Sequence, residues 1–384
     1  MRIDSRTVIA GALLSGAILI YIVGLVGWRQ GALFLVGIGA GLILYHAAFG
    51  FTSAWRDMIS KGRGAGLRAQ MIMLAVTAII FLPLLADGQL WGMELRGSVR
   101  PLSVSVIAGA FLFGVGMQLG GGCASGTLFT AGGGNMRMVL TLVAFIVGSA
   151  LGAYHLPAWQ AAPGFGPVSL LGQFGLGLAL VISLVLFASV WLGSAFVERR
   201  RYGALKKNAT CFAAGSWLRG PWPLVAGAVG LAGVNVATLT LAGRPWGVTS
   251  GFALWGSKVA AALGFNVAAW PYWQGPTASA ALEASVFSDI TSVMNFGIIL
   301  GALMAAGLAG RFAPIWRVPW RSLLAAIAGG LLLGYGARIA YGCNIGAYFS
   351  GISSSSLHGW LWFVAALVGN GLGAKLRPVF GLSN

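Results

Sequence analysis

Ten apolar stretches, each long enough to cross a membrane, constrain this chain more than any other feature of its sequence. A helix rises about 1.5 Å per residue and the hydrocarbon core is about 30 Å thick, so about 20 apolar residues span it. The stretches occupy residues 8–27, 31–49, 70–86, 102–119, 138–156, 168–195, 222–242, 284–309, 322–341 and 358–374. Only 8 % of the residues are charged, against about a quarter in soluble domains. The sequence therefore predicts an all-α polytopic membrane protein.

The basic residues report the topology of the chain. They give a net charge of +17, which in a soluble protein would suggest a nucleic-acid partner. Here they gather in short loops around 61–68, 198–207 and 311–321, whereas loops 87–100, 157–167 and 243–246 are less basic. Short basic loops face the cytoplasm. We therefore expect a multi-pass protein of the cell inner (plasma) membrane with both termini cytoplasmic, lipid around it and no nucleic-acid partner.

A glycine-rich segment with a central cysteine occurs twice in the sequence. The first copy, GAFLFGVGMQLGGGCASGTLF, begins at Gly109, and the second, GGLLLGYGARIAYGCNIGAYF, begins at Gly329. One shift of 220 residues (343 − 123) pairs Cys343 with Cys123 and aligns several of the glycines. Such a match indicates an internal duplication. We interpret residues 1–157 and 158–384 as the two halves of one membrane domain.

Each half contains five predicted spans, so the second half enters the membrane from the opposite face. Inverted repeats of this kind are common in transporters, whose sites lie near the midplane where interrupted helices meet. Four short segments fit this description, namely 50–58, 247–259 and the two cysteine segments. We therefore predict an inverted repeat of two five-span halves, with short re-entrant or interrupted helices that meet at the midplane.

Cys123 and Cys343 are the leading candidates for function. Each follows a glycine and precedes a short helical stretch, so backbone N–H groups and a positive helix end can form an anion site that contains a thiol. Buried cysteines often pack merely as small hydrophobic groups, but the duplication at equivalent breaks favours function. The neighbouring candidates for substrate binding are Gly122, Ser125, Gly342 and Asn344.

Two basic residues complete the predicted substrate-binding set. Arg338 lies five residues before Cys343 (343 − 338), and Lys258 lies on the interrupted segment 247–259. Charged groups within a span are costly and indicate function by default. For Arg338 the alternative is a side chain that snorkels to the membrane surface, and Lys258 carries a similar ambiguity.

The remaining sulfur and imidazole groups predict no metal site. Cys211 has no counterpart in the repeat and is interpreted as incidental or redox-reactive. No two cysteines are close in sequence, which excludes a zinc ribbon and a Cys-x-x-Cys redox pair. The three histidines lie at span ends and are predicted to be interfacial: His46, His155 and His358. We expect no metal and no cofactor.

At these residues the sequence resembles the YeeE/YedE family of membrane proteins, which includes bacterial thiosulfate uptake transporters and relatives linked to selenium metabolism. GGGCASGTLFTAGGGN and GARIAYGCNIGAYFSGISSSSLHGW are similar to its two signature segments, and GFTSAWRD and WGVTSGFALWG to its other interrupted segments. The resemblance covers essentially the whole chain. It implies that Cys123 and Cys343 pass thiosulfate through the centre of an hourglass-shaped protein. The thiosulfate transporters of the family carry a further cysteine where this chain has Gly50.

The function that the resemblance implies is uptake of thiosulfate or a related small sulfur anion past Cys123 and Cys343, without catalysis. A small cytoplasmic sulfur-carrier protein is the implied partner. A protonated thiol donates a weak hydrogen bond and adds no negative charge, and an apolar setting keeps a thiol protonated. The alternatives are a selenium-compound transporter of the same fold, a membrane thiol-redox protein that uses a Cys123/Cys343 pair, and a structural membrane subunit.

Overall fold

The computed structural model describes residues 3–206, 212–213, 215–314 and 316–383. Cys211, predicted to be incidental, lies outside these ranges. Within them, ten helices are long and apolar enough to cross a membrane, which confirms the predicted class and the ten predicted spans. The helices are α1 (Ser5–Leu25), α2 (Trp28–His46), α4 (Ala65–Asp87), α5 (Val104–Gly120), α7 (Met136–Gln160), α8 (Leu170–Tyr202), α10 (Leu224–Ala242), α13 (Ile290–Leu308), α14 (Trp320–Ile339) and α16 (Leu357–Leu376).

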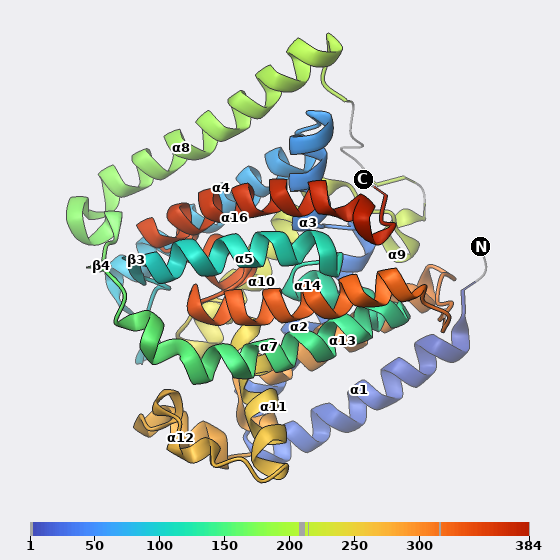
Figure 1. The fold of residues 1–384 in the computed structure, drawn as a ribbon, viewed down its shortest axis with the longest axis vertical. Helices are drawn as coiled ribbons and strands as arrows, with labels where there is room; N and C mark the ends of the chain where they lie inside the picture. Colours follow the sequence, from blue (N-terminus) through green and yellow to red (C-terminus); the bar gives the residue numbers. More distant parts are fainter. Residues whose placement is uncertain (1–2, 207–211, 214, 315, 384) are drawn as a thin grey trace.

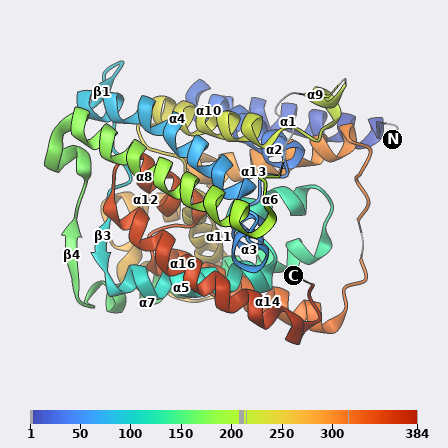
Figure 2. The ribbon, with the colours of Figure 1, turned by 90° about the horizontal axis from the view of Figure 1, so that it is seen from above.

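The long helices run roughly in one common direction and form two layers (Figure 1 and Figure 2). In one layer, α14 packs against α5 and α7, and α5 also packs against α16. In the other, α13 packs against α2, and α10 packs against both α2 and α4. Helices α1 and α8 flank this second layer, through contacts with α13 and α4.

The outer flanks of the molecule are apolar. Helices α1 and α8 leave large apolar side chains accessible, such as Leu13 (70 % exposed) on α1 and Val181 (56 % exposed) on α8. Contiguous apolar faces of this extent are unfavourable in water. These two helices therefore present their apolar faces to lipid.

Glycines allow the long helices to approach one another closely. A Cβ atom added at Gly37 of α2 would lie 2.5 Å from the carbonyl oxygen of Met294 on α13. A Cβ atom at Gly330 of α14 would lie 2.5 Å from the carbonyl oxygen of Thr141 on α7. Because lipid tails are as apolar as leucine, membrane helices associate through such close backbone packing. The high glycine content of the chain thus serves the packing of both layers.

Short helical segments interrupt the long helices, as the sequence predicts. Figure 2 shows α3, α6 and α11 between the two layers. The segments are α3 (Phe51–Arg56), the π-helix η1 (Asp57–Lys61), α6 (Ala124–Gly132), α11 (Thr249–Ala262), the π-helix η5 (Asn344–Phe349) and α15 (Ser350–Ser353). The chain breaks that hold the two cysteines therefore lie inside the helical assembly.

The connections between the helices add small elements that the sequence did not predict. Strand β1 (Gln89–Leu90) pairs antiparallel with β2 (Met93–Glu94), and β3 (Pro101–Ser103) pairs antiparallel with β4 (Gly164–Pro167). Strands β3 and β4 lie at the end of the assembly opposite to the two termini (Figure 1). The remaining elements are α9 (Ser216–Arg219), α12 (Pro276–Glu283) and the 3₁₀ segments η2 (Val267–Ala269), η3 (Pro271–Trp273), η4 (Val286–Ser288) and η6 (Arg377–Phe380).

The assignment of Glu198 to a basic loop after residue 195 is wrong. Helix α8 continues to Tyr202, and Glu198 is completely buried. Its carboxylate lies 2.8 Å from Arg68 Nη2 and 3.2 Å from Arg63 Nη1, and it accepts the N–H of Gly64 at 3.1 Å. A buried carboxylate is tolerated when it is paired and hydrogen-bonded. These contacts fasten the end of α8 to the start of α4.

Candidate functional site

Cys123 caps the N-terminus of α6. Its Sγ accepts the backbone N–H of Gly126 at 3.4 Å and lies 3.5 Å from Ser125 Oγ. The Cys123 carbonyl accepts the N–H and the hydroxyl of Thr127, both at 2.8 Å. The side chain is 2 % exposed. The structure thus holds this thiol, with Ser125 beside it, at the positive end of a buried helix.

Cys343 lies in the corresponding position before η5. Its side chain is fully buried, and its carbonyl accepts the N–H groups of Ala347 at 2.9 Å and Tyr348 at 3.4 Å. A Cβ atom at Gly342 would lie 2.7 Å from Ala347 N, so the chain can fold back this tightly only with glycine there. Tyr341 adopts φ 59°, a conformation that non-glycine residues rarely take and that clusters at functional sites.

The two cysteine segments meet in the interior of the protein. Helix α6 contacts η5, and both cysteines belong to the same buried cluster. Among the residues that the structure describes, neither thiol is engaged in a disulfide. Residues 220 positions apart in the sequence (343 − 123) are therefore brought to one place by the helices that precede them.

Asn344 offers unused hydrogen-bonding capacity beside Cys343. Its side chain is fully buried, and neither its Nδ2 nor its Oδ1 has a partner among the residues that the structure describes. A buried polar group without a partner costs about 1–3 kcal/mol. In native proteins such a group requires an explanation, for example a ligand or a water molecule. Asn344 therefore has one donor atom and one acceptor atom unused within the described part of the chain, directly after Cys343.

His358 is not interfacial, contrary to the prediction for this residue. It is fully buried in α16, its Nδ1 lies 2.7 Å from Ser356 Oγ, and its Nε2 has no partner within the described part of the chain. The sequence around position 358, a run of four serines followed by Leu357, carried no signal for this burial. The histidine adds a second buried polar group to the region that follows Cys343.

The two predicted basic residues have hydrogen-bond partners other than the thiols. Lys258 donates to the carbonyl oxygens of Leu282 at 2.5 Å and Ala284 at 2.7 Å, where it caps the C-terminal end of α12. Arg338 donates from Nη1 to Tyr272 Oη at 2.7 Å. The structure brings neither side chain into hydrogen-bonding contact with Cys123 or Cys343, whereas Gly122, Ser125, Gly342 and Asn344 all adjoin them.

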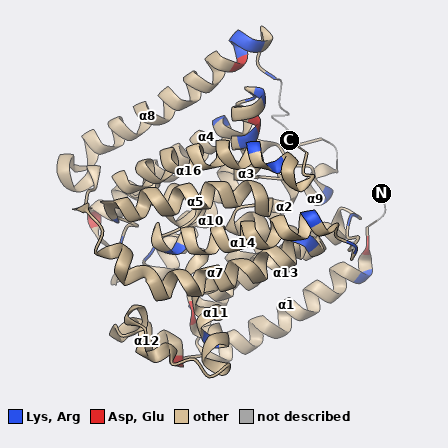
Figure 3. Cartoon of the chain, viewed as in Figure 1, with Lys and Arg blue, Asp and Glu red and all other residues tan. Residues whose placement is uncertain are grey.

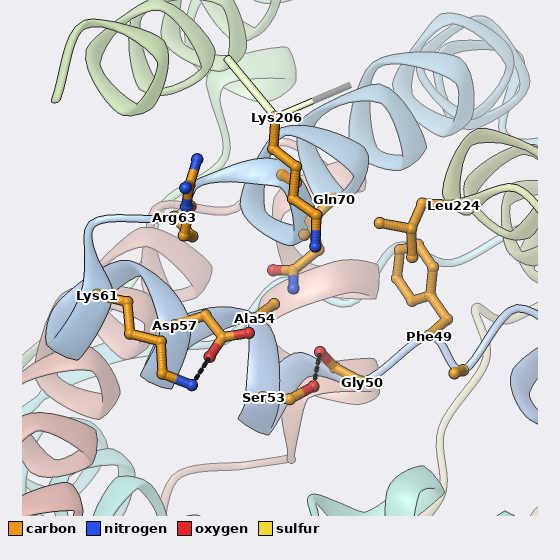
Figure 4. A pocket seen from close by; sticks show the side chains of 13 residues that line it. Phe49, Gly50, Ser53, Ala54, Asp57, Lys61, Arg63, Gln70, Lys206 and Leu224 are labelled. Atoms are coloured by element: carbon orange, nitrogen blue, oxygen red, sulfur yellow. Dashed lines mark hydrogen bonds and ion pairs between the residues drawn. The ribbon is translucent and has the colours of Figure 1, made fainter. Parts of the chain in front are cut away.

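A vestibule of about 550 Å³ opens beside α3 and η1. Figure 4 shows Lys61, Arg63 and Lys206 around it, together with Gln70 and Ser53. Gly50, at which the resemblance implies a cysteine in the thiosulfate transporters, also lines this cavity. The vestibule therefore combines basic side chains with the first interrupted segment.

Gln70 joins this vestibule to the segment that follows Cys343, a role that the sequence analysis missed. It lines the cavity, and its Oε1 accepts the indole N–H of Trp55 at 2.9 Å and the hydroxyl of Tyr348 at 3.2 Å. Gln70 is 1 % exposed, and its Nε2 has no partner in the described ranges. The signal available in the sequence was a single amide within the apolar stretch that follows Arg68.

A second buried amide fixes the position of α3. Gln118 of α5 donates from Nε2 to Thr52 O at 3.2 Å and to Asn370 Oδ1 at 3.0 Å, and its Oε1 accepts from Arg56 Nη1 at 3.3 Å. These bonds connect α5, α3 and α16. Gln118 therefore acts as a scaffold for the interrupted segment, since its polar atoms are already paired.

The fold and the site together define a class, that of polytopic helical membrane proteins with free thiols at buried helix breaks. The chain belongs to the sulphur transport family, whose sequence model matches residues 46–372. It is 30 % identical over 362 residues to a thiosulfate transporter, TsuA, of Spirochaeta thermophila, covering 88 % of this chain and 95 % of that protein. It is 24 % identical over 348 residues to the thiosulfate transporter TsuA of Escherichia coli, covering 87 % and 91 %. A probable transporter of Escherichia coli, YedE, is 32 % identical over 170 residues, covering 43 % and 41 %.

Proposed function

We propose that this protein carries thiosulfate or a closely related sulfur compound into the cell across the inner membrane, with Cys123 and Cys343 as successive contacts. The observation that carries the proposal is the meeting of α6 and η5, each preceded by a free, buried cysteine. The two relatives named as thiosulfate transporters support the choice of substrate, because they match most of the chain.

The chemistry of these breaks suits a sulfur oxyanion. Thiosulfate is a dianion with a polarisable terminal sulfur, and a protonated thiol offers it a weak donor without adding charge. The amide of Asn344, which has no partner in the described ranges, adds a stronger donor beside Cys343. Weak contacts in series let an ion both enter and leave a site, as conduction requires.

The packing supports an inverted repeat of the halves 1–157 and 158–384. Exchange of the two halves replaces α5 by α14 and α16 by α7. The contact of α5 with α16 then becomes the contact of α14 with α7, and both contacts are present. The contacts of α2 with α13 and of α10 with α4 interchange in the same way. In transporters of this architecture the substrate site lies near the midplane between the repeats, which is where the two thiols belong in this proposal.

The charge distribution supports cytoplasmic termini. Basic side chains gather at the end of the assembly where both termini lie (Figure 3), and short basic connections face the cytoplasm. The vestibule lined by Lys61, Arg63 and Lys206 then faces the cell interior. Its basic rim is a suitable surface for an acidic cytoplasmic sulfur-carrier protein.

The energetics of uptake require a driving force. Moving two negative charges inward against a potential of about 100 mV costs about 4.6 kcal/mol, at roughly 2.3 kcal/mol per charge. Ion coupling or consumption of the substrate inside the cell has to supply this energy.

Uptake of ³⁵S-thiosulfate by cells that lack other sulfur transporters tests the proposal. We expect saturable uptake that excess unlabelled thiosulfate suppresses. Direct uptake of a selenium oxyanion, with no uptake of thiosulfate, would instead identify a selenium-compound transporter. Absence of uptake together with reversible oxidation of Cys123 and Cys343 would favour the redox function.

A further inference from the structure

Three arginines come together at the end of the assembly opposite to the termini. Arg100 lies just before β3, Arg244 follows the C-terminal end of α10, and Arg338 lies in the last turn of α14. The backbone of Arg96 donates to Gly243 O at 2.8 Å, which joins the loop of Arg100 to that of Arg244. Tyr272 lies between the elements and accepts a hydrogen bond from Arg338 at 2.7 Å.

The positive charges of this group are poorly compensated. Surrounding protein lowers the pKa of Arg100, and the nearby charge of Arg338 lowers it further, with a smaller effect of Arg244. Water nevertheless reaches the Arg100 and Arg244 side chains, which are exposed. Within the described residues the one carboxylate in ion-pair distance of the three is Asp289, 3.9 Å from Arg244 Nη2. Like charges held together in this way favour binding of an anion.

A cavity of about 700 Å³ provides space for such an anion. Arg244, Tyr272, Ser250 and Asp289 are among its lining residues. Arg338 reaches the same tyrosine, with its guanidinium 5.2 Å from the ring centroid, and its Nε has no partner in the described part of the chain. Arg244 thus lines the cavity and also donates from Nη2 to Thr291 Oγ1 at 3.3 Å, while Arg338 adds this Nε, unpartnered in the described ranges, beside the tyrosine that both share.

Direct contacts connect the loop of Arg100 to the segment that follows Cys343. Ser98 donates from Oγ to Gly346 O at 3.2 Å, and its N–H donates to Ser354 Oγ at 3.0 Å. The N–H of Arg100 approaches Ser356 Oγ at 3.5 Å. An anion held by the arginines is therefore adjacent to the chain that carries Cys343.

We propose that Arg100, Arg244 and Arg338 form an outer capture site for a divalent oxyanion, separate from the thiols, that concentrates the substrate before it reaches Cys343. Guanidinium groups suit this role because their planar donors match tetrahedral oxyanions in pairs. The place of this site in uptake depends on the function proposed above, whereas binding of the oxyanion at the arginines does not.

Equilibrium binding to the purified protein tests the capture site. Isothermal titration with thiosulfate and with sulfate would compare the wild type with Arg100→Gln and Arg244→Gln, and with Arg96→Gln as the matched control. Arg96 lies on the same loop, but Glu94 already pairs with it at 2.7 Å. We expect each of the first two substitutions to weaken binding about three- to tenfold and the control to leave it unchanged.

Several outcomes would overturn this proposal. They are absence of oxyanion binding by the wild type, unchanged affinity in the Arg100→Gln/Arg244→Gln double variant, and an equal loss in Arg96→Gln. The same titration on the Cys123→Ala/Cys343→Ala variant separates the two proposals, because the capture site should still bind there. Binding at the arginines without thiosulfate uptake by cells would contradict the proposed function and retain the capture site.

Discussion

Tyr348 donates a hydrogen bond to Gln70 over 3.2 Å and so connects the segment that begins at Cys343 to the wall of the basic vestibule. The two residues are 278 positions apart in the sequence and are both almost completely buried. Gln70 also accepts a bond from Trp55. Hydrogen bonds therefore connect the segment that follows Cys343 to a residue that lines the basic vestibule.

Removal of the Gln70 amide should destabilise the protein. In Gln70→Ala, the N–H of Trp55 and the hydroxyl of Tyr348 both lose their acceptor, at about 1–3 kcal/mol for each buried group left unpaired. Tyr348→Phe should cost only about 1 kcal/mol, because the Trp55 bond survives. Thermal unfolding in detergent, followed by tryptophan fluorescence, measures both effects. Unfolding of Gln70→Ala at the wild-type temperature would contradict this role of Gln70.

Gly342→Ala should abolish uptake, whereas Gly346→Ala should be tolerated. A Cβ atom at position 342 would lie 2.7 Å from Ala347 N, while one at position 346 meets no atom within 4 Å. The clash forces the start of η5 to move by part of an ångström, and Cys343 moves with it. Uptake at matched expression measures the difference. Equal activity of the two variants would show that the tight fold at Gly342 is dispensable.

Glu198→Gln should detach the end of α8. The substitution leaves Arg68, whose side chain is 8 % exposed, without its partner, and breaking a buried ion pair costs about 3–5 kcal/mol. The control is Asp57→Asn, because Asp57 pairs with Lys61 at the surface, where such pairs contribute under about 1 kcal/mol. Proteolysis near residue 202 and thermal unfolding would reveal the loss. Similar stability of both variants would be inconsistent with a buried clamp.

A cysteine introduced at position 50 should react from the cytoplasmic side. Gly50 lines the vestibule, and the neighbouring Ser53 side chain, 2.6 Å from a Cβ atom at this position, can rotate to make room. In a Cys211→Ser background, a membrane-impermeant thiol reagent should label Gly50→Cys in inside-out vesicles. Cys123 and Cys343 should react slowly, because both are buried. Labelling in right-side-out vesicles alone would reverse the proposed orientation.

The sequence predicts the long helices well because the length and the apolar composition of each stretch are enough to indicate a membrane-spanning helix. It also predicts the breaks at Cys123 and Cys343, because glycines and duplication mark them. The end of α8 was missed because the basic residues after position 195 are typical of a loop. The ion pairs of Glu198 with Arg63 and Arg68 join residues that are far apart in the sequence. Such a contact between distant residues leaves no local pattern.

The polar groups around the thiols were harder to identify. Gln70 is a single amide at the start of an apolar stretch and His358 follows a run of serines, and their significance comes from their hydrogen bonds with Tyr348 and Ser356. Lys258 was predicted from its charge and its place on an interrupted segment, and the structure shows its ammonium group at the C-terminal end of α12. Position along the chain identified the breaks, but only the tertiary contacts distinguish groups with free donors from groups that are already paired.

The most direct test of the central claim is ³⁵S-thiosulfate uptake by Cys123→Ala and Cys343→Ala at matched expression, with Cys211→Ala as the control. The account predicts saturable uptake in the wild type and the control and loss of uptake in both other variants, while each variant unfolds near the wild-type temperature. Undiminished uptake in either Cys123→Ala or Cys343→Ala would contradict the role of the two thiols as successive contacts for the substrate.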